Sequence, residues 1–289
     1  MTVAQRIYRK SRFVFSYLKS MILGNLGKRK YEGIQSFILF VGYPRSGHTL
    51  VAALLDAHPE VVLGIEWGVL SHLRMGYRRN QILFSLERHS RLFTNRLNNT
   101  WTGYSYKIPD LWQGRYQSIK LIGDKMAGRT SMILKTDPEL INRLQTELGC
   151  PVKIIHVIRN PYDTITTMAR RSFEKSGRKG EMDTAFLSQF VDRYFDRVAE
   201  VQKLKEAGRF EIHDLYHEEL IDQSESVIEG LLHFLGVGIP EHFVSRCSEA
   251  IYQQPHKSRF EFEWTEDLKS QVIEKIGKYR FLQDYRYED

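Results

Sequence analysis

Short apolar runs alternate with segments of helical spacing along most of the chain. The apolar runs are typical of strands that are buried on both faces, and they occur at Phe37–Val41, Val61–Leu63, Ile119–Ile122, Val152–Ile158 and Phe210–Leu215. Helical spacing follows at 49–57, over most of 69–97, from Asp137 to Gly149, from Pro161 onward, and from Asp183 to Ala207. Strands that alternate with helices predict an α/β fold with a mostly parallel central sheet and helices on both faces.

Two regions depart from this alternation. Residues 98–116 carry Asn, Gly, Pro and several aromatic residues, which indicates an irregular loop. The part after residue 216 is expected to be mostly helical. The sequence contains no internal repeat and no low-complexity linker, and the one boundary we propose lies near Gly33. It separates an N-terminal segment, 1–33, from a domain at 34–289.

The N-terminal segment has its own apolar pattern. Ile7, Val14, Leu18 and Ile22 fall near one face of a helix, and Gly24 and Gly27 are expected to end it. One interpretation is a helix that packs this apolar stripe on the body of the protein. Another is a helix on a membrane surface, which would give residues 1–33 a peripheral membrane contact. A signal peptide or anchor is the least favoured, because Lys19 interrupts the apolar run and no clear cleavage pattern follows.

The N-terminal segment also differs from residues 34–289 in its net charge. Residues 1–33 contain eight Lys and Arg residues and one Glu, and their net charge of +7 equals that of the whole chain. Residues 34–289 are therefore neutral overall, so a general basic face for nucleic acid is not supported, and no nucleic-acid partner is expected.

Composition narrows the class of protein. The chain has 289 residues, of which 42% are apolar and 27% charged, an ordinary globular balance. Cys150 and Cys247 are too few for a disulfide framework and fit a reducing compartment, although one bridge remains an alternative. We therefore expect a cytoplasmic protein, with possible membrane association through residues 1–33.

A candidate phosphate-binding loop lies between the first apolar run and the first helical segment. Gly42-Tyr-Pro-Arg-Ser-Gly-His-Thr49 nearly matches the Walker pattern G-x-x-x-x-G-K-[ST], in the strand–loop–helix context that the pattern requires. Such a loop directs backbone N–H groups and a helix N-terminus at a phosphate. His48 replaces the usual lysine, and Arg45 supplies the cation instead.

The later strand ends also carry cations. A Walker nucleotidase needs a carboxylate at a strand end to hold Mg²⁺, but the strongest later strand is followed by Arg159. Asp124 could substitute, but Lys125 follows it directly. This arrangement favours a ligand with two phosphate-like groups and no required metal.

These residues together resemble a known family, the sulfotransferases that use 3′-phosphoadenosine 5′-phosphosulfate (PAPS). The similarity is greatest to the tyrosylprotein sulfotransferase group and its bacterial relatives. It is carried by Pro44-Arg-Ser-Gly-His-Thr-Leu50, Leu55-Asp-Ala-His-Pro-Glu60, Gly64-Ile-Glu66, and Ile158-Arg-Asn-Pro-Tyr-Asp163 with Thr167. Tyr216-His-Glu-Glu-Leu220 and Phe234-Leu-Gly236 are weaker matches, and the resemblance extends over about 37–280.

The resemblance implies a role for each matching residue. Glu66 would be the general base, while Lys125 and Arg45 would stabilise charge on the leaving group. The 5′-phosphosulfate would be bound by Arg45, Ser46, Gly47, His48 and Thr49, and the 3′-phosphate by Arg159 and Thr167. Tyr216 and Lys257 would contact the nucleotide, which leaves as PAP, adenosine 3′,5′-bisphosphate.

Alternatives remain open at several of these positions. Glu66 could instead cap the following helix, in which case His48 or His72 would be the base. Thr167 could bond to its own helix backbone, Tyr216 could be an ordinary core residue, and Asp163 is expected to cap a helix or form a local pair.

The acceptor is the least defined part of the prediction. We expect a small molecule that is sulfated on a hydroxyl or, as a second choice, on an amine nitrogen. Five aromatic residues could line its pocket or serve as loop anchors: Trp67, Trp101, Tyr104, Tyr106 and Trp112. The alternative functions are a P-loop kinase or nucleotidase and a protein-tyrosine sulfotransferase.

Overall fold

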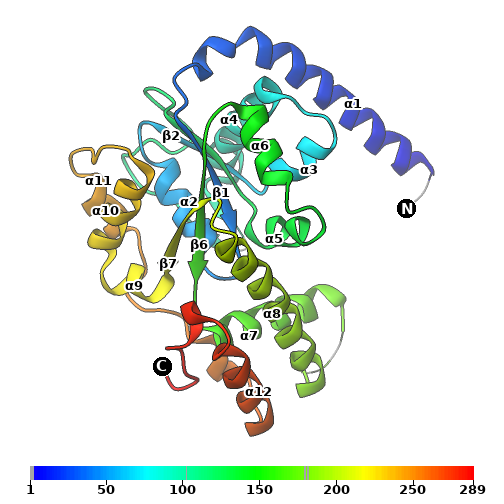
Figure 1. Ribbon diagram of the computed structural model, residues 1–289, viewed down its shortest axis with the longest axis vertical. Helices are drawn as coiled ribbons and strands as arrows, with labels where there is room; N and C mark the ends of the chain where they lie inside the picture. Colours follow the sequence, from blue (N-terminus) through cyan, green and yellow to red (C-terminus); the bar gives the residue numbers. More distant parts are fainter. Residues whose placement is uncertain (1–2, 102, 179, 181) are drawn as a thin grey trace. The chain divides into compact units, whose positions relative to one another are not determined.

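A five-stranded sheet organises the fold, with strand order β2-β5-β1-β6-β7 (Figure 1). The computed structural model describes residues 3–101, 103–178, 180 and 182–289, and within the first helix it describes side chains from Val14 onward. The strands are β1 (Ser36–Val41), β2 (Val61–Ile65), β5 (Leu121–Lys125), β6 (Val152–Ile158) and β7 (Glu211–Tyr216). β5 pairs in parallel with β1 and β2, and β6 pairs in parallel with β7. A short antiparallel pair, β3 (Thr100–Trp101) and β4 (Tyr104–Ser105), stands apart.

Helices occupy most of the chain between and after these strands. They are α1 (Val3–Leu26), α2 (His48–Asp56), α3 (Val69–Arg74), α4 (Arg79–Leu97), α5 (Ala127–Thr136), α6 (Leu140–Leu148), α7 (Pro161–Ser176), α8 (Thr184–Glu206), α9 (His217–Asp222), α10 (Ser224–Leu235), α11 (Phe243–Glu249) and α12 (Glu266–Ile276). Short 3₁₀ turns lie at Lys28–Tyr31, Ser258–Glu261 and Arg280–Leu282. The expected fold class, a mostly parallel sheet with helices on both faces, is confirmed.

The chain forms two compact units. The first comprises the described residues of 1–39, 52–126 and 137–152, and the second those of 40–51, 127–136 and 153–289. In the first unit, α4 packs on both α1 and β2. In the second unit, α7 and α8 pack together over a cluster of buried aromatic and aliphatic side chains that includes Tyr162, Ile165, Phe190 and Val198.

Two buried carboxylates anchor the first unit. Glu87 accepts hydrogen bonds from the hydroxyls of Tyr31 and Tyr116 at 2.6 and 2.9 Å. Asp56 accepts from the Leu63 N–H at 2.7 Å and from the Ser90 hydroxyl at 2.8 Å. Burial raises the pKa of Asp56 to about 7.

Helix ends in the second unit follow ordinary capping rules. Asn160 caps α7 by accepting from the Tyr162 N–H at 3.0 Å, and Pro161 occupies the first helical position, where a missing N–H costs nothing. Asp183 caps α8 by accepting from the Phe186 N–H at 2.7 Å. These caps place the starts of both helices where the sequence predicts them.

The structure differs from the sequence predictions at four places. β5 begins two residues later than expected, and Gly123, Asp124 and Lys125 belong to the strand. α5 was not predicted, because its small and polar residues give a weak helical pattern. α1 continues through Gly24 and ends at Leu26, directly before Gly27, the second of the two predicted ends. The predicted loop at 98–116 contains the β3–β4 hairpin.

The N-terminal helix α1 does not pack its apolar face on the body of the protein, as the first interpretation expected. Its described apolar side chains are exposed, and Ser20 and Gly24 are the buried positions. The side chain of Ile7, part of the predicted stripe, lies outside the described residues. Within the described part of the chain, no helix combines the length and apolar character needed to cross a membrane. Cys150 and Cys247 are free thiols.

Candidate active site

The phosphate-binding loop follows β1 and ends at the first residue of α2. Its backbone takes positive φ at Gly42, Arg45 and Gly47, with values of 124°, 77° and 97°. Ser131 of α5 holds the start of the loop, since its hydroxyl accepts from the Gly42 N–H at 2.8 Å and donates to the Gly42 carbonyl at 2.9 Å. The Ser46 hydroxyl donates to the Tyr43 carbonyl at 3.1 Å. These hydrogen bonds fix the conformation of the loop.

His48, which replaces the Walker lysine, turns back toward the strand. Its side chain is buried, and its Nε2 lies 3.1 Å from the Val41 carbonyl at the end of β1. A neutral imidazole can donate this bond and contribute to loop closure. This contact gives His48 a structural role in the loop beside the predicted nucleotide-binding one.

His217, the first residue of α9, packs against the loop at Gly47. A Cβ added to Gly47 would lie 2.5 Å from the His217 ring carbon Cδ2. Burial and then the nearby Arg159 lower the pKa of His217 to about 3, so the ring stays neutral. His217 could not be identified from the sequence, because it contacts a residue 170 positions away in the chain.

Arg159, directly after β6, connects the loop to the C-terminal part of the second unit. Its Nη1 donates to the Arg45 carbonyl at 3.2 Å, and its Nη2 donates to the His256 carbonyl. Its Nε is buried and has no hydrogen-bond partner among the described residues. A buried guanidinium N–H without an acceptor fits an anionic ligand that would supply one.

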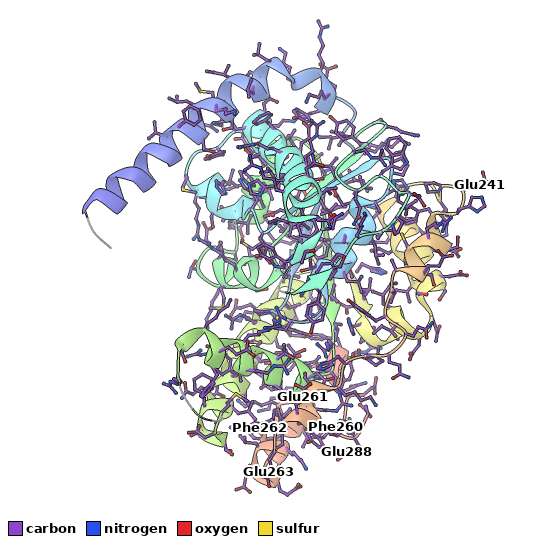
Figure 2. All side chains as sticks on the ribbon, turned by 180° about the vertical axis from the view of Figure 1, so that it is seen from behind. Glu241, Phe260, Glu261, Phe262, Glu263 and Glu288 are labelled. Atoms are coloured by element: carbon purple, nitrogen blue, oxygen red, sulfur yellow. The ribbon has the colours of Figure 1, made fainter. Side chains whose placement is uncertain are left out.

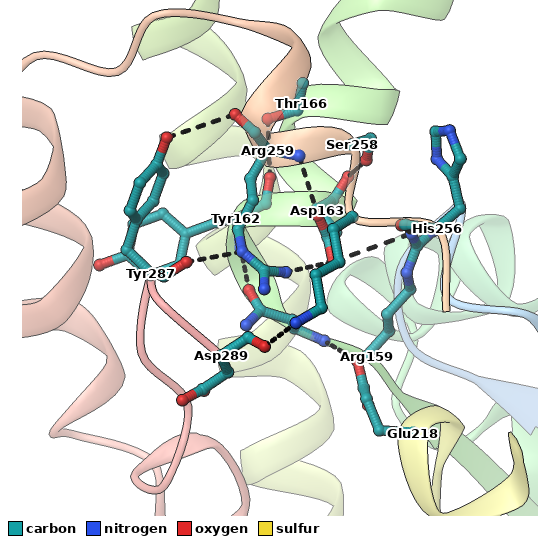
Figure 3. Close-up of polar contacts among 12 residues, drawn as sticks. Arg159, Tyr162, Asp163, Thr166, Glu218, His256, Ser258, Arg259, Tyr287 and Asp289 are labelled. Atoms are coloured by element: carbon teal, nitrogen blue, oxygen red, sulfur yellow. Dashed lines mark hydrogen bonds and ion pairs between the residues drawn. The ribbon is translucent and has the colours of Figure 1, made fainter. Parts of the chain in front are cut away.

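Thr167 and Ser258 form a hydroxyl pair beside this arginine. Their oxygens lie 2.8 Å apart. The Ser258 hydroxyl donates to the Asp163 carbonyl at 3.0 Å (Figure 3). The Thr167 hydroxyl thus has a partner outside its own helix. Its neighbour Thr166 instead donates to its own backbone, at the Tyr162 carbonyl.

Arg259 and Asp163 form a buried ion pair behind the hydroxyl pair. Arg259 Nη1 donates to Asp163 Oδ2 at 2.6 Å, and the Arg259 N–H donates to Asp163 Oδ1 at 2.9 Å. Burial raises the pKa of Asp163, while Arg159 and Arg259 oppose that rise. Asp163 also forms the expected local pair, since Arg159 Nη2 lies 3.9 Å from its Oδ2. Arg259 was missed in the sequence, although it lies in the cationic run His256-Lys257-Ser258-Arg259.

Lys257 and Tyr216 lie at the edges of this unit. Lys257 is exposed, and its Nζ donates to the Asp289 carbonyl, while Arg259 Nε donates to the Tyr287 carbonyl at 2.6 Å (Figure 3). The neighbouring run from Phe260 to Glu263 lies near Glu288 in Figure 2. Tyr216 packs at the edge of the apolar core cluster. Lys257 is placed to meet an anion, whereas Tyr216 has the environment of a core residue.

Glu66 and Lys125 form an ion pair in the first unit. Glu66 follows β2 with φ of 57°, and its N–H donates to the Lys125 carbonyl at 3.0 Å. Lys125 is the last residue of β5, and its Nζ lies 2.5 Å from Glu66 Oε1. The Lys125 side chain is 4% exposed and that of Glu66 35%. The carboxylate is thus open to solvent and held by a buried cation.

Asp124 organises the segment that follows Glu66. Its two carboxylate oxygens accept from the N–H groups of Trp67, Gly68 and Val69 at 3.2, 2.9 and 2.7 Å. Burial raises the pKa of Asp124 to about 6. Asp124, rather than Glu66, therefore satisfies the start of α3, so the helix-cap interpretation of Glu66 was wrong. These bonds also occupy the carboxylate that a Walker-type magnesium site would need.

An aromatic cluster adjoins Glu66 in sequence. Trp67 stacks on His72 with ring centroids 4.0 Å apart and an angle of 7°, and Tyr77 meets Trp67 edge-on at 5.8 Å. His72 Nδ1 lies 3.0 Å from the Gly68 carbonyl, so this ring is held by α3. Among the aromatic residues proposed for an acceptor pocket, Tyr104 lies in the exposed hairpin strand β4. The Trp67 ring also lies near the ring of His89, with centroids 6.3 Å apart.

Comparisons with known proteins identify the family and support the fold. The profile described as the sulfotransferase family matches residues 37–241. Sulfotransferase STF9 from Mycobacterium avium is 12% identical, with a TM-score of 0.51, and the match covers 92% of this chain and 83% of that one. Mouse sulfotransferase SULT7A1, solved in complex with PAP, is 14% identical, with a TM-score of 0.50 and coverage of 86% of each chain. A search of curated proteins gave no significant match.

At these identities the two solved structures support the fold alone. The family profile covers well over half of the chain, and it includes the phosphate-binding loop, Glu66, Lys125, Arg159 and Thr167. The chain therefore belongs to the sulfotransferase family and is a transferase enzyme.

Proposed function

We propose that this enzyme transfers the sulfuryl group of PAPS to a hydroxyl of a small-molecule acceptor. The observation that carries the proposal is the position of Arg159, which bonds to the Arg45 carbonyl of the phosphate loop and keeps a buried Nε without a partner among the described residues. A donor with two separate phosphate groups matches a cation placed between a glycine-containing loop and a hydroxyl pair. Family membership implies the use of PAPS.

The donor supplies the sulfuryl group and leaves as PAP. In the overall reaction, an acceptor oxygen forms a bond to sulfur, the bond between sulfur and the 5′-phosphate oxygen breaks, and that oxygen keeps the electron pair. The acceptor O–H proton must be removed at the same time or earlier. The residues therefore have three tasks, namely to bind the donor, neutralise the leaving oxygen and accept a proton.

Donor binding is assigned to the second unit. The 5′-phosphosulfate would contact the backbone N–H groups of 45–49, the start of α2 and the hydroxyls of Ser46 and Thr49. The 3′-phosphate would contact Arg159, the Thr167–Ser258 hydroxyl pair and Lys257. The Asp163–Arg259 ion pair would hold the Ser258 turn in position. Tyr216 and His48 keep the nucleotide-binding roles implied by the family resemblance.

Proton removal and charge stabilisation are assigned to Glu66, Lys125 and Arg45. Glu66 has a partly exposed carboxylate on a segment fixed by Asp124, which suits a base that must meet an incoming hydroxyl. Lys125 is buried and cationic, so it can stabilise negative charge with little competition from water. Arg45 would contribute a second cation from within the phosphate loop.

Selective binding of the two nucleotide phosphates tests the proposal. A ligand that binds only the folded state raises the free energy of unfolding by about 2.7 kcal/mol at a hundredfold excess over Kd. PAP should therefore raise the melting temperature, while adenosine 5′-phosphosulfate, which lacks the 3′-phosphate, should raise it less at equal concentration. Equal shifts would contradict the role of Arg159, and a shift with ATP alone would favour a nucleotidase.

A further inference from the structure

The helix α1 presents an apolar surface that its own unit does not cover. Seven large apolar side chains between residues 14 and 26 are more than one third exposed: Val14, Phe15, Leu18, Met21, Ile22, Leu23 and Leu26. Phe15 is 68% exposed and Leu26 78%. Such a concentration on one element is unusual for an isolated soluble surface and marks an interaction site.

The opposite face of α1 explains why these side chains point outward. Ser20 is buried, and Gly24 lies so close to α4 that an added Cβ would be 2.4 Å from the Asn80 carbonyl oxygen. Tyr17 also bonds on this side, because the Gln81 side chain donates to its carbonyl at 3.3 Å. Small and polar residues thus form the packed face, and the apolar residues remain for another partner.

Charge indicates the kind of partner. α1 contains no Asp or Glu, and residues 1–33 carry the whole net charge of the protein. Lys19, Lys28 and Arg29 are exposed. A groove of about 710 Å³ beside α1 is lined by three cations, Lys28, Arg78 and Arg79, and by two carboxylates, Glu32 and Glu147, so it is not itself an anion site. The exposed apolar side chains of α1, with Lys19 on the helix and Lys28 and Arg29 directly after it, match a surface that is apolar inside and anionic outside.

We propose that α1 lies in the interface of an anionic lipid bilayer, with its apolar residues in the acyl boundary and its cations among the head groups. The helix would lie on the membrane, in agreement with the absence of a membrane-crossing helix among the described residues. A second copy of the chain or an apolar protein surface could also cover the exposed residues. Neither partner would account for the positive charge of residues 1–33. The experiments below distinguish both of them from a membrane.

Aromatic contacts connect the packed face of α1 to the segment that contains Glu66. The ring of Tyr17 meets Tyr77 edge-on at 5.0 Å, and Tyr77 in turn meets Trp67, the residue after Glu66. Two ring contacts therefore join the membrane-binding helix to the proposed base. If the proposed function is correct, the acceptor is an amphiphile whose tail stays in the bilayer and whose head group carries the hydroxyl.

Vesicle binding tests the position of α1. The full chain should sediment with phosphatidylcholine vesicles that contain phosphatidylglycerol, and binding should weaken as salt is added. Phe15→Glu/Leu18→Glu/Ile22→Glu changes exposed positions only and should reduce binding by at least about tenfold. Lys19→Gln/Lys28→Gln/Arg29→Gln should have a similar effect. Ile239→Glu/Ile273→Glu, the same exchange at exposed positions on other elements, is the matched control and should bind as the parent does.

Two results would overturn this position for α1. One is equal sedimentation with and without phosphatidylglycerol, or binding that the triple variants retain. The other is a dimer in light scattering that the apolar triple variant converts to monomer while vesicle binding is absent. Circular dichroism and PAP-induced thermal shifts would verify that the variants fold.

The acceptor class has a separate test. With ³⁵S-labelled PAPS, the enzyme should label the organic phase of a total lipid extract presented as vesicles, and the apolar triple variant should label it less. Label confined to an aqueous metabolite extract would overturn the amphiphile assignment. Label in neither extract, with vesicle binding intact, would contradict the proposed function and leave the membrane contact of α1 established.

Discussion

Glu66 adopts a left-handed backbone conformation that residues with a side chain rarely take. Several contacts enforce it, since its N–H bonds to the Lys125 carbonyl, its carboxylate pairs with Lys125, and Asp124 binds the next three N–H groups. Conformations of this kind persist where surrounding structure determines them, often at functional sites. The contacts fix where the carboxylate of Glu66 points, which is what a general base needs.

The proposed division between base and donor-binding residues predicts opposite kinetic effects. Glu66→Gln keeps the size of the side chain but removes the proton acceptor, so turnover at saturating PAPS should fall by ~10²–10⁴-fold with little change in PAP affinity. Arg159→Ala should weaken PAP binding and raise the KM for PAPS, with a smaller loss at saturation. Calorimetry with PAP and product formation at saturating PAPS measure the two quantities.

Matched variants control for general damage. Glu60→Gln alters another glutamate of the first unit that pairs with a lysine, Lys120 at 2.6 Å, and should leave turnover unchanged. Arg171→Ala alters another arginine near Arg159 in sequence, on α7, and should leave PAP binding unchanged. Near-parental turnover by Glu66→Gln would exclude Glu66 as the base and direct attention to His48 and His72.

Residues differ in how far the sequence alone could identify them. Glu66, Lys125, Arg159 and Thr167 stand in motifs with family spacing, so resemblance selects them. Asp124, His217 and Arg259 act through tertiary contacts. Asp124 bonds to residues more than fifty positions away in the chain, and Arg259 pairs with Asp163. Nothing in local sequence encodes such pairings.

At the scale of elements, the continuous apolar runs predicted which segments form strands more accurately than they predicted the first and last residue of each strand. β6 has the predicted limits, because Val152–Ile158 is a continuous run of mostly apolar residues between Pro151 and Arg159. β5 was displaced because Asp124 and Lys125 look like loop residues, yet both are buried by pairing within the first unit. The first of the two interpretations of α1 was wrong, because an apolar stripe usually packs inward whereas the apolar side chains from Val14 to Leu26 are exposed.

The contact between the phosphate loop and α9 makes Gly47 sensitive to substitution. Gly47→Ala would strain a φ of 97° and place Cβ against the His217 ring. A strained backbone residue costs about 1–3 kcal/mol, so PAP affinity should fall by roughly 5- to 150-fold if the loop shifts to relieve it. Calorimetry with PAP measures the loss.

Two further variants separate strain from contact. Gly180→Ala imposes a similar φ, 93°, where nothing lies within 4 Å, and should not change PAP affinity. Gly47→Ala/His217→Ala removes the ring and should recover part of the affinity lost in the single variant. No recovery would mean that backbone strain alone causes the defect.

At the scale of the whole molecule, the proposed donor site relies on side-chain cations. In this proposal, Arg159, Lys257, Arg45 and Lys125 would carry the charge that a P-loop nucleotidase obtains partly from Mg²⁺. We therefore expect EDTA to leave the rate of sulfuryl transfer nearly unchanged. The assay compares initial rates with EDTA, with added Mg²⁺ and with neither. A strict requirement for a divalent ion would contradict this prediction.

Buried titratable groups set opposing effects of pH on folding stability. Burial raises the pKa of Asp56 from 3.8 to about 7 and that of Asp124 from 3.8 to about 6. Burial also lowers the pKa of His89 from 6.5 to about 4 and that of His217 from 6.5 to about 3. The pKa values of His156 and His213 are lowered as well. The buried aspartates therefore bind protons more readily in the folded state than in the unfolded state. The buried histidines bind protons more readily in the unfolded state.

The sign of each effect follows from which state holds the proton. As pH falls from 7 to 4, the folded state takes up protons on Asp56 and Asp124 that the unfolded state does not yet bind, which increases stability. Over the same range the unfolded state protonates histidines that stay neutral in the fold, which decreases stability. The raised pKa values of Asp163 and Glu218 add to the effect of the two aspartates, so two sets of groups oppose each other over this range.

Urea titrations at pH 7.5 and pH 5 measure the resulting change in the free energy of unfolding. Asp124→Asn removes one group that gains a proton in the folded state, so on going from pH 7.5 to pH 5 this variant should lose more stability, or gain less, than the parent does. An equal or more favourable change in Asp124→Asn would show that Asp124 does not take up a proton in the folded state over this range.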